Sequence, residues 1–146
     1  MGSGYLSQDE IKQILANYRT IAVVGLSRDP GKASHGVSAY LKAHGFRIIP
    51  VNPFADEVLG EKSYQSLLDI PPEIQETIEV VDIFRPSEHV LPIVKQAIKL
   101  KAKYGKPYVV WMQLDIVNEL VAEVAKKAGL TVVMDKCMMV EHRRFF

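Results

Sequence analysis

The stretch Thr20–Gly36, "TIAVVGLSRDPGKASHG", joins a continuous apolar run to a turn that contains glycines, serines and a lysine. A short apolar run that ends at a glycine is typical of a strand covered on both faces, as in a parallel sheet. When a helix follows such a strand, the turn between them presents free backbone N–H groups and the positive end of the helix dipole. The stretch therefore predicts a buried strand at 20–25, followed by an anion-binding turn.

Apolar strands and helices of about a dozen residues alternate through the rest of the chain. This alternation indicates right-handed βαβ crossovers and an α/β fold, a Rossmann-like three-layer α/β/α domain with a five-stranded parallel sheet. We interpret segment 55–76, which contains a proline pair, as an elaborated crossover with a short helix near 63–68. The strands are predicted at 20–25, 46–52, 78–84, 107–113 and 131–135, and the helices at 7–18, up to residue 44, at 87–101 and at 116–128.

The length and composition predict one domain, 1–146, with the helix at about 7–18 packed on it. Hydrophobic residues make up 48% of the chain and charged residues 24%, which is ordinary for a soluble protein. A net charge of +1 counts against a nucleic-acid binder. We expect a cytoplasmic protein, because the sequence shows neither a signal peptide nor an apolar run of membrane-spanning length. We also expect a monomer or a small homo-oligomer.

The turn after the first strand matches neither of the two common phosphate-binding fingerprints. The dinucleotide motif G-x-G-x-x-G requires glycine where this chain has Ser27. The P-loop spacing is exceeded by one residue, and Ala33 stands where a hydroxyl would hold magnesium. The second strand ends in Val51, Asn52 and Pro53 and lacks the acid that usually binds the ribose of NAD. An NAD(P)-binding oxidoreductase module therefore stays the alternative and not the leading hypothesis.

Five motifs occur in one order: "VVGLSRDPGKASHG", "IIPVNP", "VDIFRP", "VVWMQLDIVNE" and "GLTVVMDKCMMVEHRR". Together they resemble the small stand-alone coenzyme A-binding proteins, whose domain is related to the N-terminal CoA-binding domain of the succinyl-CoA synthetase alpha subunit. The resemblance implies CoA, or an acyl-CoA, as the ligand, bound at the carboxyl ends of the strands. It implies phosphate contacts from Gly25, Ser27, Arg28, Lys32 and Ser34, an adenosine site at Val51, Asn52 and Pro53 opposite Phe84 and Arg85, and a pantetheine path along Trp111, Met112 and Gln113.

Cys137 is the single cysteine of the chain, and it follows the fifth predicted strand by two residues. It is either a small buried apolar residue or a thiol near the thiol end of CoA that forms a mixed disulfide, with Lys136 or His142 activating it. A metal site is not expected, because no second pair of ligands accompanies Cys137 and His142. We identify no catalytic residue, and we expect a ligand-binding protein more than an enzyme.

Overall fold

A computed structural model describes residues 5–146, and its centre is one parallel sheet of five strands. The strand order is β2-β1-β5-β6-β7, so the chain moves outward from β1 in one direction and then returns to continue on the other side. The order therefore reverses between β1 and β5, which is where open α/β sheets bind ligands. The strands are β1 (Thr20–Val24), β2 (Arg47–Val51), β5 (Val80–Ile83), β6 (Val109–Met112) and β7 (Thr131–Val133).

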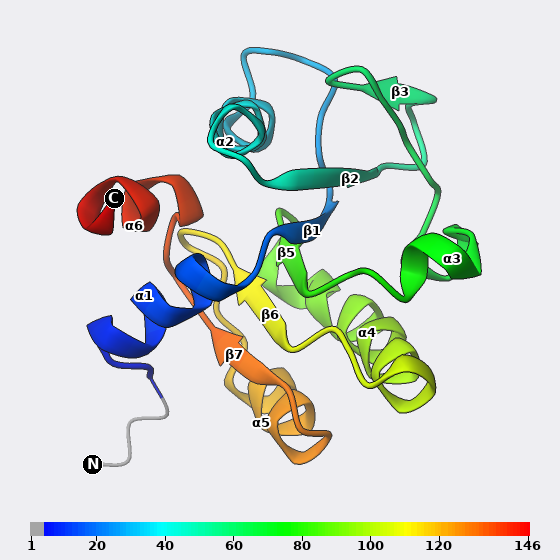
Figure 1. The fold of residues 1–146 in the computed structure, drawn as a ribbon. Coiled ribbons are helices and arrows are strands. Elements are labelled where there is room, and N and C mark those ends of the chain that lie inside the picture. Colours follow the sequence, from blue (N-terminus) through cyan, green and yellow to red (C-terminus); the bar gives the residue numbers. More distant parts are fainter. Residues whose placement is uncertain (1–4) are drawn as a thin grey trace.

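Helices cover both faces of this sheet, as Figure 1 shows, which confirms the predicted Rossmann-like α/β fold. The helices α1, α2 and α6 lie against one face, and α4 and α5 lie against the other. Their bounds are α1 (Gln8–Asn17), α2 (Ala33–Ala43), α4 (Val90–Tyr104), α5 (Glu119–Lys127) and α6 (Met138–Phe145). No helix within residues 5–146 is both long and apolar enough to span a membrane.

Side chains that alternate along each strand divide the core into two clusters. On β1, Ala22 and Val24 join the cluster under α4 and α5, whereas Ile21 and Val23 join the cluster under α1, α2 and α6. All four are buried, as a strand covered on both faces requires. The continuous apolar run of the first strand therefore follows directly from its central place in the sheet.

Local signals fix the helix ends. A capping box opens α1, because the Ser7 hydroxyl accepts from the N–H of Glu10 while the Glu10 carboxylate accepts from the N–H of Ser7. The side chain of Asn118 caps α5 by accepting from the N–H of Val121. Gly105 ends α4 in the left-handed conformation, with φ +81°.

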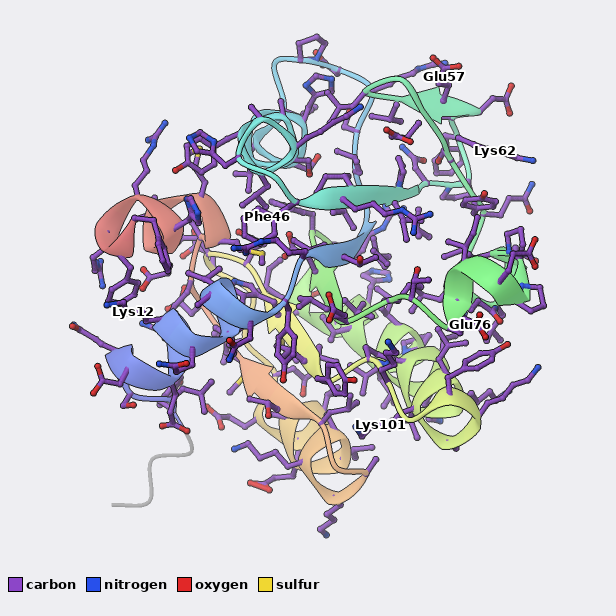
Figure 2. All side chains as sticks on the ribbon, in the orientation of Figure 1. Lys12, Phe46, Glu57, Lys62, Glu76 and Lys101 are labelled. Carbon is purple, nitrogen blue, oxygen red and sulfur yellow. The ribbon has the colours of Figure 1, made fainter. Side chains whose placement is uncertain are left out.

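The crossover between β2 and β5 differs from the prediction, since no helix lies at 63–68. It contains a hairpin, β3 (Glu57–Val58) and β4 (Glu61–Lys62), then a 3-10 turn η1 (Leu67–Asp69) and the short helix α3 (Pro72–Gln75). Tyr64 forms a bridge to Val51 and thereby extends the sheet briefly instead of entering a helix. The side chains of Glu57 and Lys62 project outward from the hairpin (Figure 2).

Two further elements differ from the prediction. The helix predicted at 87–101 begins with a 3-10 turn, η2 (Ser87–His89), and α4 then continues to Tyr104. The C-terminal segment, for which the sequence predicted no element, forms α6 and packs against α1 and α2.

Candidate functional site

The carboxyl ends of β1 and β5 approach each other closely at Gly25. Its N–H donates to the carbonyl of Val51 at 2.8 Å, and its φ is +90°. A Cβ atom at this position would lie 2.6 Å from the carbonyl oxygen of Phe84. Only glycine fits both this backbone conformation and the space beside the Phe84 carbonyl. No side chain of residue 25 therefore fills the sheet edge at the point where the strand order reverses.

The turn after Gly25 folds on its own side chains before α2 begins. The Ser27 hydroxyl accepts from the N–H of Asp29 at 3.0 Å, and the Asp29 carboxylate accepts from the N–H of Gly31 at 2.9 Å. The buried hydroxyl of Ser34 accepts from the N–H of Ser27 at 3.0 Å. Lys32, the residue before α2, makes no capping hydrogen bond with its side chain. This side chain therefore leaves the first backbone N–H groups of α2 uncapped.

A cavity of about 420 Å³ opens on the side of the sheet that faces α4. Apolar side chains from the ends of β1 and β2 form its floor, among them Val24 and Val51. The segment after β4 and the start of α4 form its polar wall. The full lining consists of Val24, Val51, Pro53, Gln65, Ser66, Leu67, Arg85, Pro86, His89, Ile93 and Gln96.

A second cavity, of about 340 Å³, lies at the carboxyl ends of β5 and β6 beside the start of α2. Its wall is mostly apolar, and the Cys137 side chain forms part of it. The ionisable residues that line it are Cys137 and Arg85. The full lining consists of Ala33, Val37, Phe84, Arg85, Pro86, Gln113, Leu114, Ile116 and Cys137.

Arg85 and Pro86 line both cavities and therefore join them into one continuous edge. The Nε atom of Arg85 lies 3.3 Å from the place where a Cβ of Gly25 would be, so this side chain lies over the open glycine. Within residues 5–146, the guanidinium has neither an ion-pair partner nor a side-chain hydrogen-bond partner. A half-buried, unpaired cation at the junction of two cavities is suited to an anionic ligand that crosses from one to the other.

Six of the residues singled out from the sequence line these cavities. They are Val51, Pro53, Phe84, Arg85, Gln113 and Cys137. Gly25 borders the junction, whereas Ser27, Arg28, Lys32 and Ser34 belong to the adjoining turn and line neither cavity. Arg28 and Lys32 are exposed.

Asn52 fastens the turn to the end of β2. Its side-chain amide donates to the carbonyl of Leu26 at 2.9 Å, and its oxygen accepts from the N–H of Phe54 at 2.8 Å. Because both ends of the amide are bonded within the protein, the geometry gives Asn52 the role of a support beneath the site.

Trp111 and Met112 are placed differently from what the resemblance implies. Both side chains are fully buried, Trp111 in the cluster under α1, α2 and α6, and Met112 in the cluster under α4 and α5. The indole N–H of Trp111 donates to the carbonyl of Lys136 at 2.8 Å. Strand β6 is covered on both faces, so these residues lie inside the core, and only Gln113, just past the strand, lines a cavity.

His142 does not accompany Cys137 at the cavity. Its Nδ1 atom forms a 2.8 Å hydrogen bond with the Tyr40 hydroxyl, and its ring packs edge-on against Phe46. Burial, together with the neighbouring His44 and Arg19, lowers the pKa of His142. The ring is therefore neutral near pH 7 and supplies no positive charge for a thiolate. Within residues 5–146, no group of three or more His, Cys, Asp and Glu side chains is arranged to hold a metal ion.

Several lining residues lie outside the motifs that the sequence singled out. Gln65 and Ser66 come from the elaborated crossover, His89 ends the 3-10 turn η2, and Ile93 and Gln96 belong to α4. The helix predicted after the third strand could have indicated the lining residues near α4, because helices in such folds begin at the ligand-binding edge of the sheet. The crossover offered no such signal, since its path depends on the Tyr64 bridge.

Comparisons with known proteins show which family the chain belongs to. A family model described as a CoA binding domain matches residues 19–143. The uncharacterized protein YneT of Bacillus subtilis is 41% identical over 136 residues, which cover 93% of this chain and 94% of YneT. A hypothetical protein from Pyrococcus horikoshii superimposes with a TM-score of 0.87 and 40% identity, covering 99% of this chain and 96% of that one.

A shorter match links the chain to a larger enzyme. The acetate–CoA ligase (ADP-forming) II of Archaeoglobus fulgidus is 45% identical over 65 residues, or 43% of this chain. The matched part is 10% of the ligase, so the similarity concerns one small portion of that protein.

Proposed function

The chain belongs to the CoA-binding domain family, and from this premise we propose that it binds coenzyme A, or an acyl-CoA, along the carboxyl edge of its sheet. The observation that carries the proposal is the pair of cavities that share Arg85 beside Gly25. A ligand with apolar parts at two ends and phosphates between them matches that arrangement. CoA has this form, with an adenosine 3′-phosphate at one end, a pyrophosphate, and a pantetheine arm that ends in a thiol.

The lining of each cavity supports an orientation for the ligand. The first cavity combines Val51 and Pro53, as flat apolar surface for adenine, with amide and hydroxyl groups that include Gln65 and Ser66. The second cavity is narrower and mainly apolar, which suits the pantetheine arm or a short acyl group. Each volume is within the range of about 300 to 1,000 Å³ that is usual for small-molecule sites.

Arg85, the start of α2 and the cations of the turn would hold the phosphates. Each charge-assisted hydrogen bond contributes roughly 1.5 to 3 kcal/mol, whereas micromolar affinity corresponds to about 8 kcal/mol, before the cost of association is subtracted. Three such bonds barely reach that value. Burial of the adenine and of the arm in the two cavities must therefore supply the rest.

Cys137 adds a covalent possibility at the end of the second cavity. In the finer form of the proposal, the Cys137 thiolate attacks a disulfide of CoA. A bond forms between the Cys137 sulfur and the CoA sulfur, the original S–S bond breaks, and the other half leaves as a thiolate with the electron pair. This exchange needs no oxidant besides the CoA disulfide itself.

We propose a binding role without catalysis, carried by one domain, and we prefer CoA to NAD(P). Asn52 takes the place at the end of β2 where an acid would hold the ribose of NAD, and Ser27 takes the place of the second glycine of the dinucleotide motif. Both departures weaken NAD binding, whereas neither removes the anion-binding start of α2.

Isothermal titration calorimetry with CoA and with NAD tests this function. We expect one CoA per chain and no heat from NAD at the same concentration. Arg85→Gln and Lys32→Ala should weaken CoA binding, the former about tenfold or more and the latter about threefold. Lys99→Ala, a change of the same charge on the exposed surface of α4, is the matched control. Absence of CoA binding at millimolar concentration would overturn the proposal.

A further inference from the structure

Strand β5 carries a carboxyl group in the middle of the core. Asp82 is fully buried, and its register partners on the two adjacent strands are Val23 and Trp111. Its Oδ1 atom accepts from the side-chain amide of Gln113 at 2.6 Å, whereas its Oδ2 atom has no partner within residues 5–146. Burying a carboxyl with one satisfied oxygen costs stability that an apolar residue would not, so its presence points to a role other than packing.

Gln113 connects this carboxyl to the beginning of α6. Its amide nitrogen donates to Asp82, and its oxygen accepts from the N–H of Met138 at 3.2 Å. The two bonds together fix the orientation of the amide, because a flipped amide would present its NH₂ group to another N–H donor. The carboxylate of Asp82 therefore determines which end of Gln113 faces α6.

Cys137 immediately precedes Met138 and stands at the N-cap position of α6. It has no capping hydrogen bond from its side chain, and the thiol lines the second cavity beside Gln113. The backbone at the start of α6, which Gln113 holds, consequently sets where the sulfur lies. The charged groups nearest to the thiol along the chain and across the cavity are Lys136 and Arg85.

We propose that Asp82 is a positioning residue that acts through Gln113 to place the Cys137 thiol in the second cavity, and that protonation of this buried carboxyl loosens that placement. The inference rests on the proposed function, since it concerns the thiol that would meet CoA. A protonated Asp82 can donate to the Gln113 oxygen, which turns the amide and removes the acceptor from the N–H of Met138.

The environment of Asp82 supports such a change near neutral pH. Burial raises the pKa of Asp82 to about 7, while the Gln113 side chain and the nearby backbone of Ile83 oppose the rise. No charged side chain contributes to the shift. The polar groups buried on the helices of this face are Ser34 and Ser38 of α2 and Glu141 and His142 of α6.

The test measures disulfide exchange at Cys137 with 4,4′-dithiodipyridine, a small probe that needs no CoA recognition. The Cys137 thiolate attacks one sulfur of the probe, a new S–S bond forms and the S–S bond of the probe breaks. Pyridine-4-thiolate leaves with the electron pair and takes up a proton from water to give thiopyridone. The thiolate fraction is read from ultraviolet absorbance at each pH, so that the rate is expressed per thiolate. In the wild-type protein we expect this rate to rise about fivefold as the pH passes through 7, equivalent to one hydrogen bond.

The variants separate positioning from a general effect of charge. Asp82→Asn keeps the shape and an acceptor oxygen but does not titrate, so its rate per thiolate should stay high and independent of pH. Asp82→Leu removes the acceptor and should give the low rate at every pH. Glu141→Gln changes a buried acid of α6 that is paired with Arg144, and it should keep the wild-type profile.

A rate per thiolate that is flat in the wild-type protein, or one that rises equally in Asp82→Asn, would overturn the inference. Calorimetry with reduced CoA on the same proteins keeps the two ideas apart. CoA binding with a flat profile leaves the proposed function standing without the positioning role. A rate per thiolate that rises with pH as expected, in a protein that does not bind CoA, would overturn the proposed function and leave the positioning role of Asp82 standing.

Discussion

The two faces of the sheet bury different kinds of side chain. The face under α4 and α5 buries an apolar cluster together with the hydrogen-bonded side chain of Gln75. The face under α1, α2 and α6 buries four polar side chains beside its apolar cluster: Asp82, Ser38, Glu141 and His142. Buried polar groups cost stability unless they are paired, and two of them, Ser38 and Asp82, carry an atom with no partner in the described part of the chain. Both of these unpartnered atoms lie on the face under α1, α2 and α6, so that face carries polar groups retained at a cost in stability.

This difference follows the position of the second cavity. Gln113, Cys137 and the beginnings of α2 and α6 lie on the polar face, and the chain of bonds from Asp82 ends there. The buried polar groups that cost stability therefore lie beside the second cavity, where the Cys137 thiol is held.

The largest effect concerns the stability cost of Asp82 itself. The folded state holds the proton more tightly than the unfolded chain, because the pKa is about 7 in the fold against 3.8 for the ordinary group. Stability therefore falls as the pH rises through this window, by about 4 kcal/mol in all, since a tenfold change in proton affinity corresponds to about 1.4 kcal/mol. Urea unfolding at pH 4 and pH 8 should show this loss in the wild-type protein and not in Asp82→Asn. Equal pH dependence in both would remove the contrast between the faces.

On the face under α4 and α5, shortening a buried side chain should lower the stability of the protein without changing its affinity for CoA. Leu100 of α4 is buried and lies in the cluster under α4 and α5, outside both cavity linings. Leu100→Ala should cost about 3 kcal/mol of unfolding free energy and leave the CoA affinity unchanged in calorimetry on the folded protein. A large loss of affinity would show that packing under α4, outside both cavity linings, also shapes the site.

An intermediate effect is expected at Asn52, which ties the turn after Gly25 to the end of β2. Asn52→Ala removes two hydrogen bonds and should cost about 1 to 2 kcal/mol of stability. Because the turn would then be held less firmly, CoA affinity should fall a few-fold as well. Asn17→Ala, at the exposed end of α1, provides the comparison. Unchanged affinity in Asn52→Ala would separate the turn from the site.

The smallest effect is a pH dependence at His142. Its pKa is lowered, so as the pH falls below about 6.5 the unfolded chain takes up a proton that the folded protein resists. Acidification from pH 7.5 to pH 5.5 also adds stability at Asp82, in the wild-type protein and in His142→Gln alike. The gain in unfolding free energy over this range should therefore be smaller in the wild-type protein than in His142→Gln, and guanidinium unfolding at the two pH values measures the difference. A larger gain in the wild-type protein than in the variant would contradict the assignment of His142 as a neutral buried ring.

The sequence predicted the central strands and the helices of the α4 and α5 face because apolar periodicity reports burial directly. The run Thr20–Val24 is apolar throughout since both of its faces are covered. The polar face was less predictable. Trp111 belongs to a motif of the family, yet a sequence does not tell whether an aromatic side chain lies in the core or on a cavity wall. The same holds for Met112, which is buried on the opposite face, under α4 and α5. Helix α6 went unpredicted because it is only 8 residues long, which is shorter than the window over which helical periodicity is recognised.

The candidate site was predictable in part for a similar reason. Gly25, Val51, Phe84 and Cys137 follow strands, and strand ends meet at one edge of a parallel sheet. The contribution of Gln65 and Ser66 depends on a tertiary bridge at Tyr64, and no local pattern announces such a bridge.

The central claim is that one CoA molecule occupies both cavities across Arg85. Nuclear magnetic resonance titration of the labelled protein with CoA tests it most directly, through amide shifts of Gln96 beside the first cavity and of Ile116 beside the second. The account predicts that both signals move with one common dissociation constant and reach saturation at one CoA per chain. Shifts confined to one cavity, or two unrelated dissociation constants, would contradict it.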